Sequence, residues 1–201
     1  MCPKVVRNMF KAIRQCMAED LLTQSVKIGG VGDIVEIDES KFGKRKYYRG
    51  KRVIGKWVLG GICRRTGQMF LVECPNNKRD HHTLMWLIRK YVHQGTTIVT
   101  DKWKGYLPLQ AHGYIHHDVN HKQGFVNPST GAHTNTIEGA WFHTKRHCKR
   151  GHGNTRTNSD SLEIALYEYM WMKRYHVTRS TDDVKRMFSK EIPLLMCRIF
   201  S

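Results

Sequence analysis

The sequence predicts an α/β fold in which helices pack on the faces of a mixed β-sheet. Three observations support this prediction: three short β-type runs follow one another, strands and helices then alternate, and the last part of the chain is helical. A meander followed by strand and helix alternation is typical of a mixed sheet covered by helices. With 201 residues the chain is long enough for one buried core, so we expect one main domain.

The first elements are predicted from periodicity and turn residues. Apolar residues recur at helical spacing over residues 5–22, and the three glycines of KIGGVG then end the helix. Short strands are predicted at IVEID (34–38), WVLGGIC (57–63) and MFLVEC (69–74), with RRTG as the turn of a hairpin. The chain therefore begins with a helix and continues with three successive strands.

The middle of the chain is predicted to alternate between helices and strands. Asp80 can cap a helix whose apolar residues, Leu84, Leu87, Ile88 and Tyr91, share one face. TTIVTD (96–101) predicts a strand, and a short helix around residues 106–111 and a strand at YIHHDV (114–119) follow.

The last third is predicted to be a long loop and two helices. Residues 123–135 are rich in Gly, Pro, Ser, Thr and Asn, and an amphipathic helix covers residues 162–170. We expect residues 1–30 to form an N-terminal helix and linker, residues 31–177 the main domain, and residues 178–201 a tail that could hold a further helix.

The charge predicts a polyanionic partner. The chain has 34 Lys+Arg against 17 Asp+Glu, a formal net charge of +17 at pH 7. Such a balance favours association with nucleic acid. A membrane surface is the competing interpretation, but no long apolar run or strongly amphipathic basic helix supports it.

The cysteines and the N-terminus bear on the compartment. Six cysteines are scattered without a CxxC pair, so neither a zinc ribbon nor a disulfide framework is predicted. Charges are spread through the first 22 residues, which excludes a secretory signal in this stretch. We expect a protein that is not secreted, nuclear in a eukaryote or cytoplasmic in a bacterium.

Two acids end β-type runs in this basic chain, Asp38 and Asp101. If their strands are neighbours, the carboxylates lie roughly 5 Å apart and repel each other, and a divalent cation would neutralise them. Glu138 could complete a site of hard oxygen ligands of the kind that magnesium binds together with substrate phosphate oxygens. Its local alternative is a capping box formed by Asn135 and Glu138 at the start of a helix.

Basic side chains surround these acids in the sequence. Lys145 follows Glu138 by two helical turns, and Arg146 extends the positive surface, although both could simply complement a helix dipole. The stretch KFGKRKYYRGKRVIGKW (41–57) interleaves cations with aromatic residues, which favours contact with DNA over a solvated loop. The candidate DNA-binding residues of this stretch are Lys44, Arg45, Lys46, Arg49, Lys51 and Arg52.

Three long segments resemble a known family: VEIDESKFGKRKYYRGKRVIGKWVLGGICRRTG, TTIVTDKWKGY and VNHKQGFVNPSTGAHTNTIEGAW. They are similar to the DDE transposase domain of the Merlin group and related bacterial insertion sequences, the ISXO-like transposase domain, over residues 27–175. The resemblance implies a ribonuclease-H-like fold with a mixed five-stranded sheet, and DNA cleavage and strand transfer with two Mg²⁺ or Mn²⁺ ions. It implies that Asp38, Asp101 and Glu138 are the catalytic and metal-binding residues.

The resemblance also assigns secondary roles and partners. Lys145 matches a lysine that contacts DNA, and Asn135 is a secondary candidate because some relatives use an asparagine of this motif. The implied partners are transposon ends and target DNA, on which a homo-oligomer would assemble. Such transposases usually carry an N-terminal DNA-recognition region, so residues 1–30 are interpreted as the remnant of a longer one.

Two other functions share these features. One is a catalytically silent, domesticated DNA-binding protein, and the other is a ribonuclease-H-fold nuclease acting on a different nucleic acid. Among the histidines, His133 is a further site candidate because it lies close to Glu138 in the sequence; the pairs His81/His82 and His117/His121 are interpreted as surface or core residues rather than metal ligands.

Overall fold

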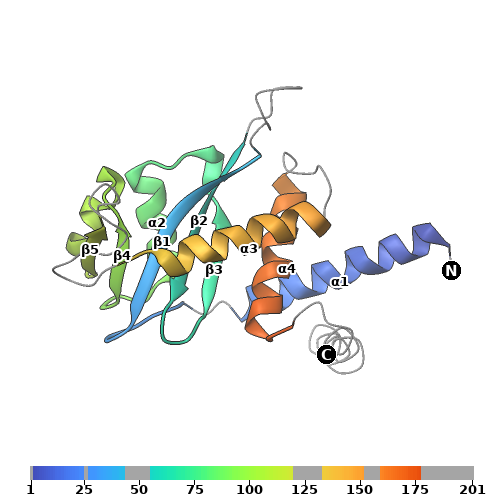
Figure 1. The fold of residues 1–201 in the computed structure, drawn as a ribbon, viewed down its shortest axis with the longest axis horizontal. Coiled ribbons are helices and arrows are strands. Elements are labelled where there is room, and N and C mark those ends of the chain that lie inside the picture. Colours follow the sequence, from blue (N-terminus) through green and yellow to red (C-terminus); the bar gives the residue numbers. More distant parts are fainter. Residues whose placement is uncertain (1, 25–26, 44–54, 120–132, 152–158, 178–201) are drawn as a thin grey trace.

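The computed structural model of this protein describes residues 2–24, 27–43, 55–119, 133–151 and 159–177 (Figure 1). The helices and strands are α1 (Pro3–Thr23), β1 (Ile34–Phe42), β2 (Lys56–Cys63), β3 (Met69–Glu73), η2 (Pro75–Asn77), α2 (His81–Tyr91), β4 (Thr97–Asp101), η3 (Lys104–His112), β5 (Ile115–Val119), α3 (Asn135–Gly151) and α4 (Ser159–Arg174). Here η marks a 3₁₀ helix. None of the helices described is long and apolar enough to cross a membrane.

The five strands form one mixed sheet in the order β3-β2-β1-β4-β5. β1 pairs antiparallel with β2 and parallel with β4, while β2–β3 is antiparallel and β4–β5 is parallel. A central strand of such a sheet is covered on both faces, and β1 accordingly contains few exposed positions along its length. This is the ribonuclease-H-like arrangement, and the prediction of fold class is confirmed.

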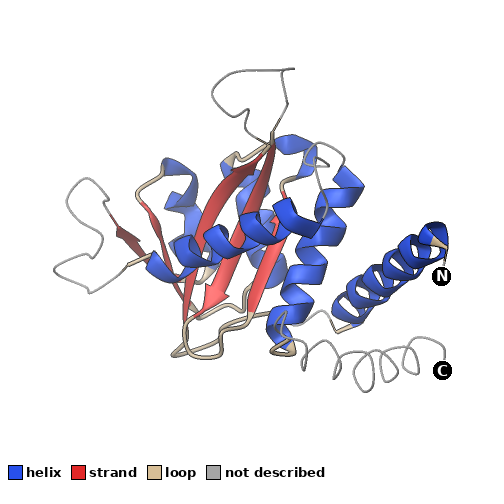
Figure 2. Ribbon diagram, turned by 45° about the vertical axis from the view of Figure 1, so that its right-hand side comes forward, coloured by secondary structure: helices blue, strands red, loops and turns tan. Residues whose placement is uncertain are grey.

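Alternation along the strands sends side chains into two separate cores. On one face, Ile37 and Leu59 pack with Leu84 and Ile88 of α2 and with Tyr106 of η3. On the other face, apolar strand residues pack against α3 and α4; they are Phe42, Val58 and Leu71, and their helical partners include Ile137, Trp141 and Leu166. Figures 1 and 2 show α3 lying across this second face, with α4 beside it. We call the two faces the α2 face and the α3 face.

The N-terminal helix is attached to α4. Cys16 and Met17 of α1 pack with Trp171. The buried carboxylate of Asp20 accepts hydrogen bonds from Trp171 Nε1 at 3.0 Å and from the Tyr175 hydroxyl at 2.9 Å. α1 therefore packs against α4 and lies beyond it, on the side away from the sheet (Figure 1).

The predicted order of elements is confirmed, with local corrections. β1 runs to Phe42 instead of ending near Asp38, because it pairs with β2 along its whole length. The short helix around residues 106–111 is a 3₁₀ helix that contains Pro108, which has no backbone N–H to donate to an α-helical ladder. The 3₁₀ turn at Pro75–Asn77 was not predicted. Most of the predicted long loop and the tail from residue 178 lie outside the described residues.

Candidate active site

Topology brings Asp38 and Asp101 together. β1 and β4 are parallel neighbours, with Glu36 opposite Val99. Continuing that register by two residues along each strand brings Asp38 beside Asp101. The two acids predicted at strand ends therefore lie next to each other near the middle of the sheet.

Asp38 lies in the electrostatic field of both other predicted acids. Burial raises the pKa of Asp38 to about 6, and the negative charges of Asp101 and Glu138 add to this increase. A hydrogen bond from the backbone N–H of Glu39 and one from Trp141 act in the opposite direction. Carboxylates from β1, β4 and α3 thus lie near enough to one another to interact electrostatically at Asp38.

Glu36, a residue that sequence reasoning missed, joins α3 to β1. Its carboxylate is fully buried and accepts the backbone N–H groups of Thr136 at 2.8 Å and Ile137 at 3.0 Å, as well as the Thr136 hydroxyl at 2.8 Å. Backbone N–H groups in the first turn of a helix have no partner within the helix, and a carboxylate there also complements the helix dipole. The strand that carries Asp38 therefore caps the helix that carries Glu138.

Two further residues hold this junction. Arg64 Nε donates to Glu36 at 2.7 Å, and Arg64 Nη2 donates to the carbonyl oxygen of His133 at 2.7 Å. His133 Nδ1 itself lies 3.4 Å from Glu36. His133 is thus placed at Glu36, two residues along β1 from Asp38, where it flanks the start of α3.

The alternative interpretation of Glu138, a capping box with Asn135, does not describe the hydrogen bonds at the start of α3. α3 begins at Asn135, and its first N–H groups bond to Glu36, a side chain about a hundred positions away. The Glu138 carboxylate instead accepts a hydrogen bond from the Thr134 hydroxyl at 2.9 Å. The cap comes from the adjacent strand because the helix start is packed against the sheet.

Trp141 makes the second connection between α3 and β1. Its indole Nε1 donates to Asp38 Oδ2 at 3.0 Å, and its ring packs edge-on against Phe42, with ring centroids 6.0 Å apart. Gly60 lies opposite Asp38 in the β1–β2 pair and leaves room for the ring. A Cβ at Gly60 would lie 2.7 Å from two atoms of the Trp141 ring, closer than carbon atoms approach without strain.

We therefore expect Gly60→Ala to displace Trp141 and destabilise the chain by about 1 to 3 kcal/mol, as overpacking of a core does. Gly139→Ala on α3 is the matched control, because nothing lies within 4 Å of a Cβ there and alanine favours a helix by about 0.5 to 1 kcal/mol over glycine. Urea unfolding of both variants measures the effects. Equal stability of the two variants would contradict the packing of Trp141 over Gly60.

A fourth acid, Glu39, borders the site from the α2 face. Burial raises the pKa of Glu39 to about 7, and the charges of Asp101 and Asp38 contribute. The hydroxyl of the fully buried Tyr106 and the guanidinium of Arg79 oppose this shift. Acidic side chains of β1 therefore lie on both faces of the sheet, with Asp38 on the α3 face and Glu39 on the α2 face.

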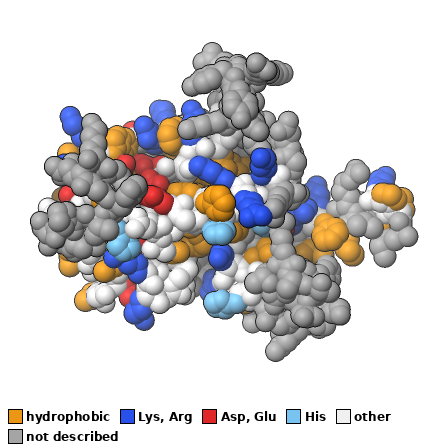
Figure 3. Space-filling view, in the orientation of Figure 1, with side chains coloured by type: hydrophobic (Ala, Val, Ile, Leu, Met, Phe, Trp, Pro, Cys, Tyr) orange, Lys and Arg blue, Asp and Glu red, His pale blue; other side chains and the backbone are white. Residues whose placement is uncertain are grey.

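Basic side chains lie near the acids on the α3 face. Lys145 Nζ is 5.7 Å from the ring centroid of Phe42, the last residue of β1, and Arg146 is exposed. Figure 3 shows acidic side chains gathered on this face, with Lys and Arg side chains nearby. The predicted DNA-binding residues from Lys44 to Arg52 lie outside the described residues.

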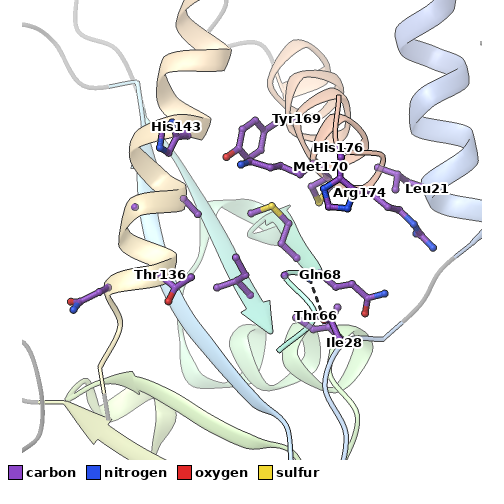
Figure 4. Close-up of a pocket in the computed structure, with 17 residues that line it drawn as sticks. Leu21, Ile28, Thr66, Gln68, Thr136, His143, Tyr169, Met170, Arg174 and His176 are labelled. Carbon is purple, nitrogen blue, oxygen red and sulfur yellow. Dashed lines mark hydrogen bonds between the residues drawn. The ribbon is translucent and has the colours of Figure 1, made fainter. Parts of the chain in front are cut away.

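A cavity of about 770 Å³ lies between α3, α4 and the β2–β3 turn (Figure 4). Asn135, Gly139, Ala140 and His143 contribute to it from α3, and residues of α4 and of the β2–β3 turn complete it. Helical periodicity places Ala140 and His143 on the flank away from Glu138 and Lys145, whereas Asn135 precedes Glu138 by three residues and is its neighbour on the helix surface.

The donor chemistry of the three acids fits a divalent cation. Carboxylate oxygens are ligands of Mg²⁺, and the mutual repulsion that raises the pKa of Asp38 is relieved by a positive ion. In the present side-chain arrangement, no group of three or more His, Cys, Asp or Glu among the described residues is placed to hold a metal ion. Asp38 and Glu138 are instead hydrogen-bonded to Trp141 and Thr134.

Residues 30–158 match the sequence model of the ISXO2-like transposase domain. The chain belongs to this family of DDE transposases. No curated protein sequence matches the chain. The ISXO2-like match covers β1, β4 and α3, the three elements that bring Asp38, Asp101 and Glu138 together.

The ISXO2-like domain is also similar to solved structures. The HTLV-2 integrase catalytic core domain in complex with magnesium, in its dimeric form, is 12% identical; the match covers 72% of this chain and 88% of that chain with a TM-score of 0.47. An intasome of simian T-cell lymphotropic virus is 12% identical over 71% of this chain and 50% of that chain, with a TM-score of 0.36. The Drosophila P element transposase strand transfer complex is 10% identical over 96% of this chain and 61% of that chain, with a TM-score of 0.28.

Sequence signals for the missed residues of this ISXO2-like domain did exist. Glu36 precedes Asp38 by two positions and therefore lies on the same face of the strand. Trp141 follows Glu138 by three positions and so points to a neighbouring part of α3. In both cases the spacing indicates a shared face, but it does not name the partner across the sheet.

Proposed function

We propose that this ISXO2-like domain catalyses metal-dependent cleavage of DNA and strand transfer at transposon ends, assembled on DNA as a homo-oligomer. One observation supports this most directly: Asp38, the central acid, is under the electrostatic influence of both Asp101 and Glu138. Carboxylates that are partly buried near one another repel and thereby lower the stability of the fold. Acids with such perturbed pKa values are found most often at functional sites.

Asp38, Asp101 and Glu138 would hold the Mg²⁺ or Mn²⁺ ions. Bound there, divalent ions would supply the charge that lowers the pKa of a water molecule or a 3′-hydroxyl and stabilises the leaving oxygen. The protein orients these carboxylates. Trp141 fixes one oxygen of Asp38, and the cap by Glu36 sets where α3 presents Glu138.

Cations of the chain would bind the DNA backbone around this centre. Lys145 is two turns from Glu138 on the same side of α3, and its Nζ lies over the ring of Phe42 at the end of β1. A positive group beside a scissile phosphate stabilises charge that develops in the transition state. Arg146 and the basic residues from Lys44 to Arg52 would extend contact along the backbone.

Glu138→Gln tests the proposal. The change keeps the size of the side chain but removes a charged ligand, and we expect metal-dependent cleavage of a labelled duplex to fall at least about 100-fold, about 3 kcal/mol in the activation barrier. The exposed Glu163 on α4 provides the control Glu163→Gln, which is expected to cleave like the unchanged protein. Single-turnover assays with Mg²⁺ and with Mn²⁺ measure both variants.

Two results would contradict the proposal. If the unchanged protein binds DNA but neither cleaves it nor binds Mn²⁺ through the three acids, the chain is a binding module without catalysis. If it cleaves RNA or an RNA–DNA hybrid in preference to duplex transposon ends, it is a nuclease of the same fold with another substrate.

A further inference from the structure

The α2 face has a hollow whose lining includes none of the three predicted catalytic acids. Its volume is about 960 Å³, and α2, η3 and the segments beside them line it. We call it the α2 hollow. α2 packs against the sheet from the side opposite α3, so the sheet and a helical layer separate the α2 hollow from the α3 face.

The lining of the α2 hollow is basic. Three permanent cations contribute, Lys27, Arg89 and Lys90, and all three are exposed. Four histidines join them, His81, His82, His93 and His112. Among the described residues that line the hollow there is no aspartate or glutamate, although Asp80, the N-cap of α2, directly precedes His81. Several cations without a counter-charge repel one another, and a polyanion would relieve that repulsion.

The fold holds these groups in a row. His81 and Arg89 lie eight residues apart on α2, a rise of about 12 Å at 1.5 Å per residue, and His93 lies just beyond the end of the helix. Lys27 is held at the end of this row, because the N–H of Ile28 donates to the Tyr91 carbonyl at 2.8 Å and the N–H of His93 donates to the Ile28 carbonyl at 3.1 Å. A row of this length can meet several successive phosphates of a DNA strand.

Stability of the helix accounts for only part of this charge, because Lys27 and His93 lie outside α2. Arg89 and Lys90 lie in the last turn of α2, where a positive charge complements the helix dipole. His81 and His82 lie in the first turn, where positive charge is unfavourable, and the N-cap residue Asp80 directly before them interacts electrostatically with His82. Their rings are tilted by 38° to each other, with centroids 3.8 Å apart.

The row also exposes an aromatic ring. Trp86 is 55% exposed although it is a large apolar side chain, and Lys90 Nζ lies 5.5 Å from the centroid of its ring. An exposed aromatic ring among cations is a common element of nucleic-acid surfaces.

We propose that the α2 hollow binds the phosphate backbone of a second segment of duplex DNA, while the α3 face holds the segment that reacts. This inference rests on the proposed function in DNA chemistry, which supplies the duplex partner. The opposite positions of the two surfaces would let one chain contact two duplex segments at once.

The test compares two triple variants of the full chain with equal loss of charge. The hollow variant carries Lys27→Gln, Arg89→Gln and Lys90→Gln. The control variant carries Lys4→Gln, Lys11→Gln and Lys173→Gln, all exposed positions on α1 and α4. Fluorescence anisotropy without divalent metal measures binding to a duplex at several salt concentrations, so the result does not depend on cleavage.

We expect the hollow variant to lose about 2 to 3 units from the slope of log K against log salt and at least about tenfold in affinity, since each phosphate contact contributes about 0.9. The control should lose less than about one unit. A second variant, His81→Gln with His82→Gln, probes the other end of the row and should also weaken binding. Thermal melting checks that all variants fold.

Equal slopes for the hollow and control variants would overturn the proposal. It would also fail if polyglutamate or single-stranded RNA depended on the α2 hollow more strongly than duplex DNA does, because the partner would then be an acidic protein or RNA. Cleavage of a short end duplex by the hollow variant should match that of the unchanged protein. If neither the unchanged protein nor the variants cleave DNA but the salt slopes differ as expected, the proposed catalytic function is wrong, while DNA binding by the α2 hollow is supported.

Discussion

Asp38→Asn is expected to abolish metal-dependent cleavage and, at the same time, to stabilise the metal-free protein. Loss of the central charged ligand should lower single-turnover cleavage by about 1,000-fold or more, about 4 kcal/mol in the barrier. Asparagine keeps an oxygen that can accept the hydrogen bond from Trp141, so the packing of α3 on β1 should survive.

The stabilisation follows from the direction of the pKa shift. The pKa of Asp38 is raised from 3.8 to about 6 in the folded chain, so folding disfavours the ionised form. The stability linked to this group is fully present below pH 3.8 and is lost as the pH rises through about 6. Because asparagine never ionises, Asp38→Asn should be more stable than the unchanged protein at pH 7 by about 1 to 3 kcal/mol.

Urea unfolding at pH 4 and pH 7 without metal measures this effect. The gain from Asp38→Asn should be present at pH 7 and absent at pH 4, where the aspartate is largely protonated in the folded chain. Glu19→Gln, at an exposed position of α1, should change neither stability nor cleavage. If Asp38→Asn destabilises the chain at pH 7, Asp38 has a structural role and the electrostatic account of the site is wrong.

Glu36→Ala should produce the largest loss of stability. The change leaves the guanidinium of Arg64 and the first N–H groups of α3 without their carboxylate partner. Removing one member of a buried ion pair costs about 3 to 5 kcal/mol, and loss of a helix cap costs about 1 kcal/mol. We expect the variant to unfold at much lower urea concentration, with α3 detached first in hydrogen exchange.

Glu36→Gln separates positioning from stability. Glutamine preserves the shape and one acceptor oxygen, so the chain should fold, but the start of α3 loses its charged cap. We expect Mn²⁺ affinity and the cleavage rate each to fall about tenfold or more, as changes in groups that orient metal ligands do. An exposed control on α4, Glu163→Gln, should leave both unchanged. A folded Glu36→Gln variant with unchanged Mn²⁺ affinity would show that the cap does not set the position of Glu138.

Local patterns were sufficient to predict the order of helices and strands and the candidate acids. Alternation and helical spacing depend on neighbouring residues, which is why β4 and α2 were found where they were predicted and β1 begins where it was predicted. The carboxylates of Asp38 and Asp101 were recognised because an acid directly after a buried β-run is unusual in a basic chain. The sequence determined the elements and which chemical groups they carry.

Only the tertiary structure decided how those groups are held. The cap on α3 comes from Glu36, which lies about a hundred positions away, and the Asn135–Glu138 pattern had suggested a local cap instead. Trp141 reaches Asp38 because Gly60 on the next strand leaves space for its ring. Such contacts depend on strand order and packing between distant segments, and local periodicity contains no information about which distant side chain will lie across the interface. The chain's own sequence therefore supplies the acids, and the packing of α3 on the sheet decides whether they can act together.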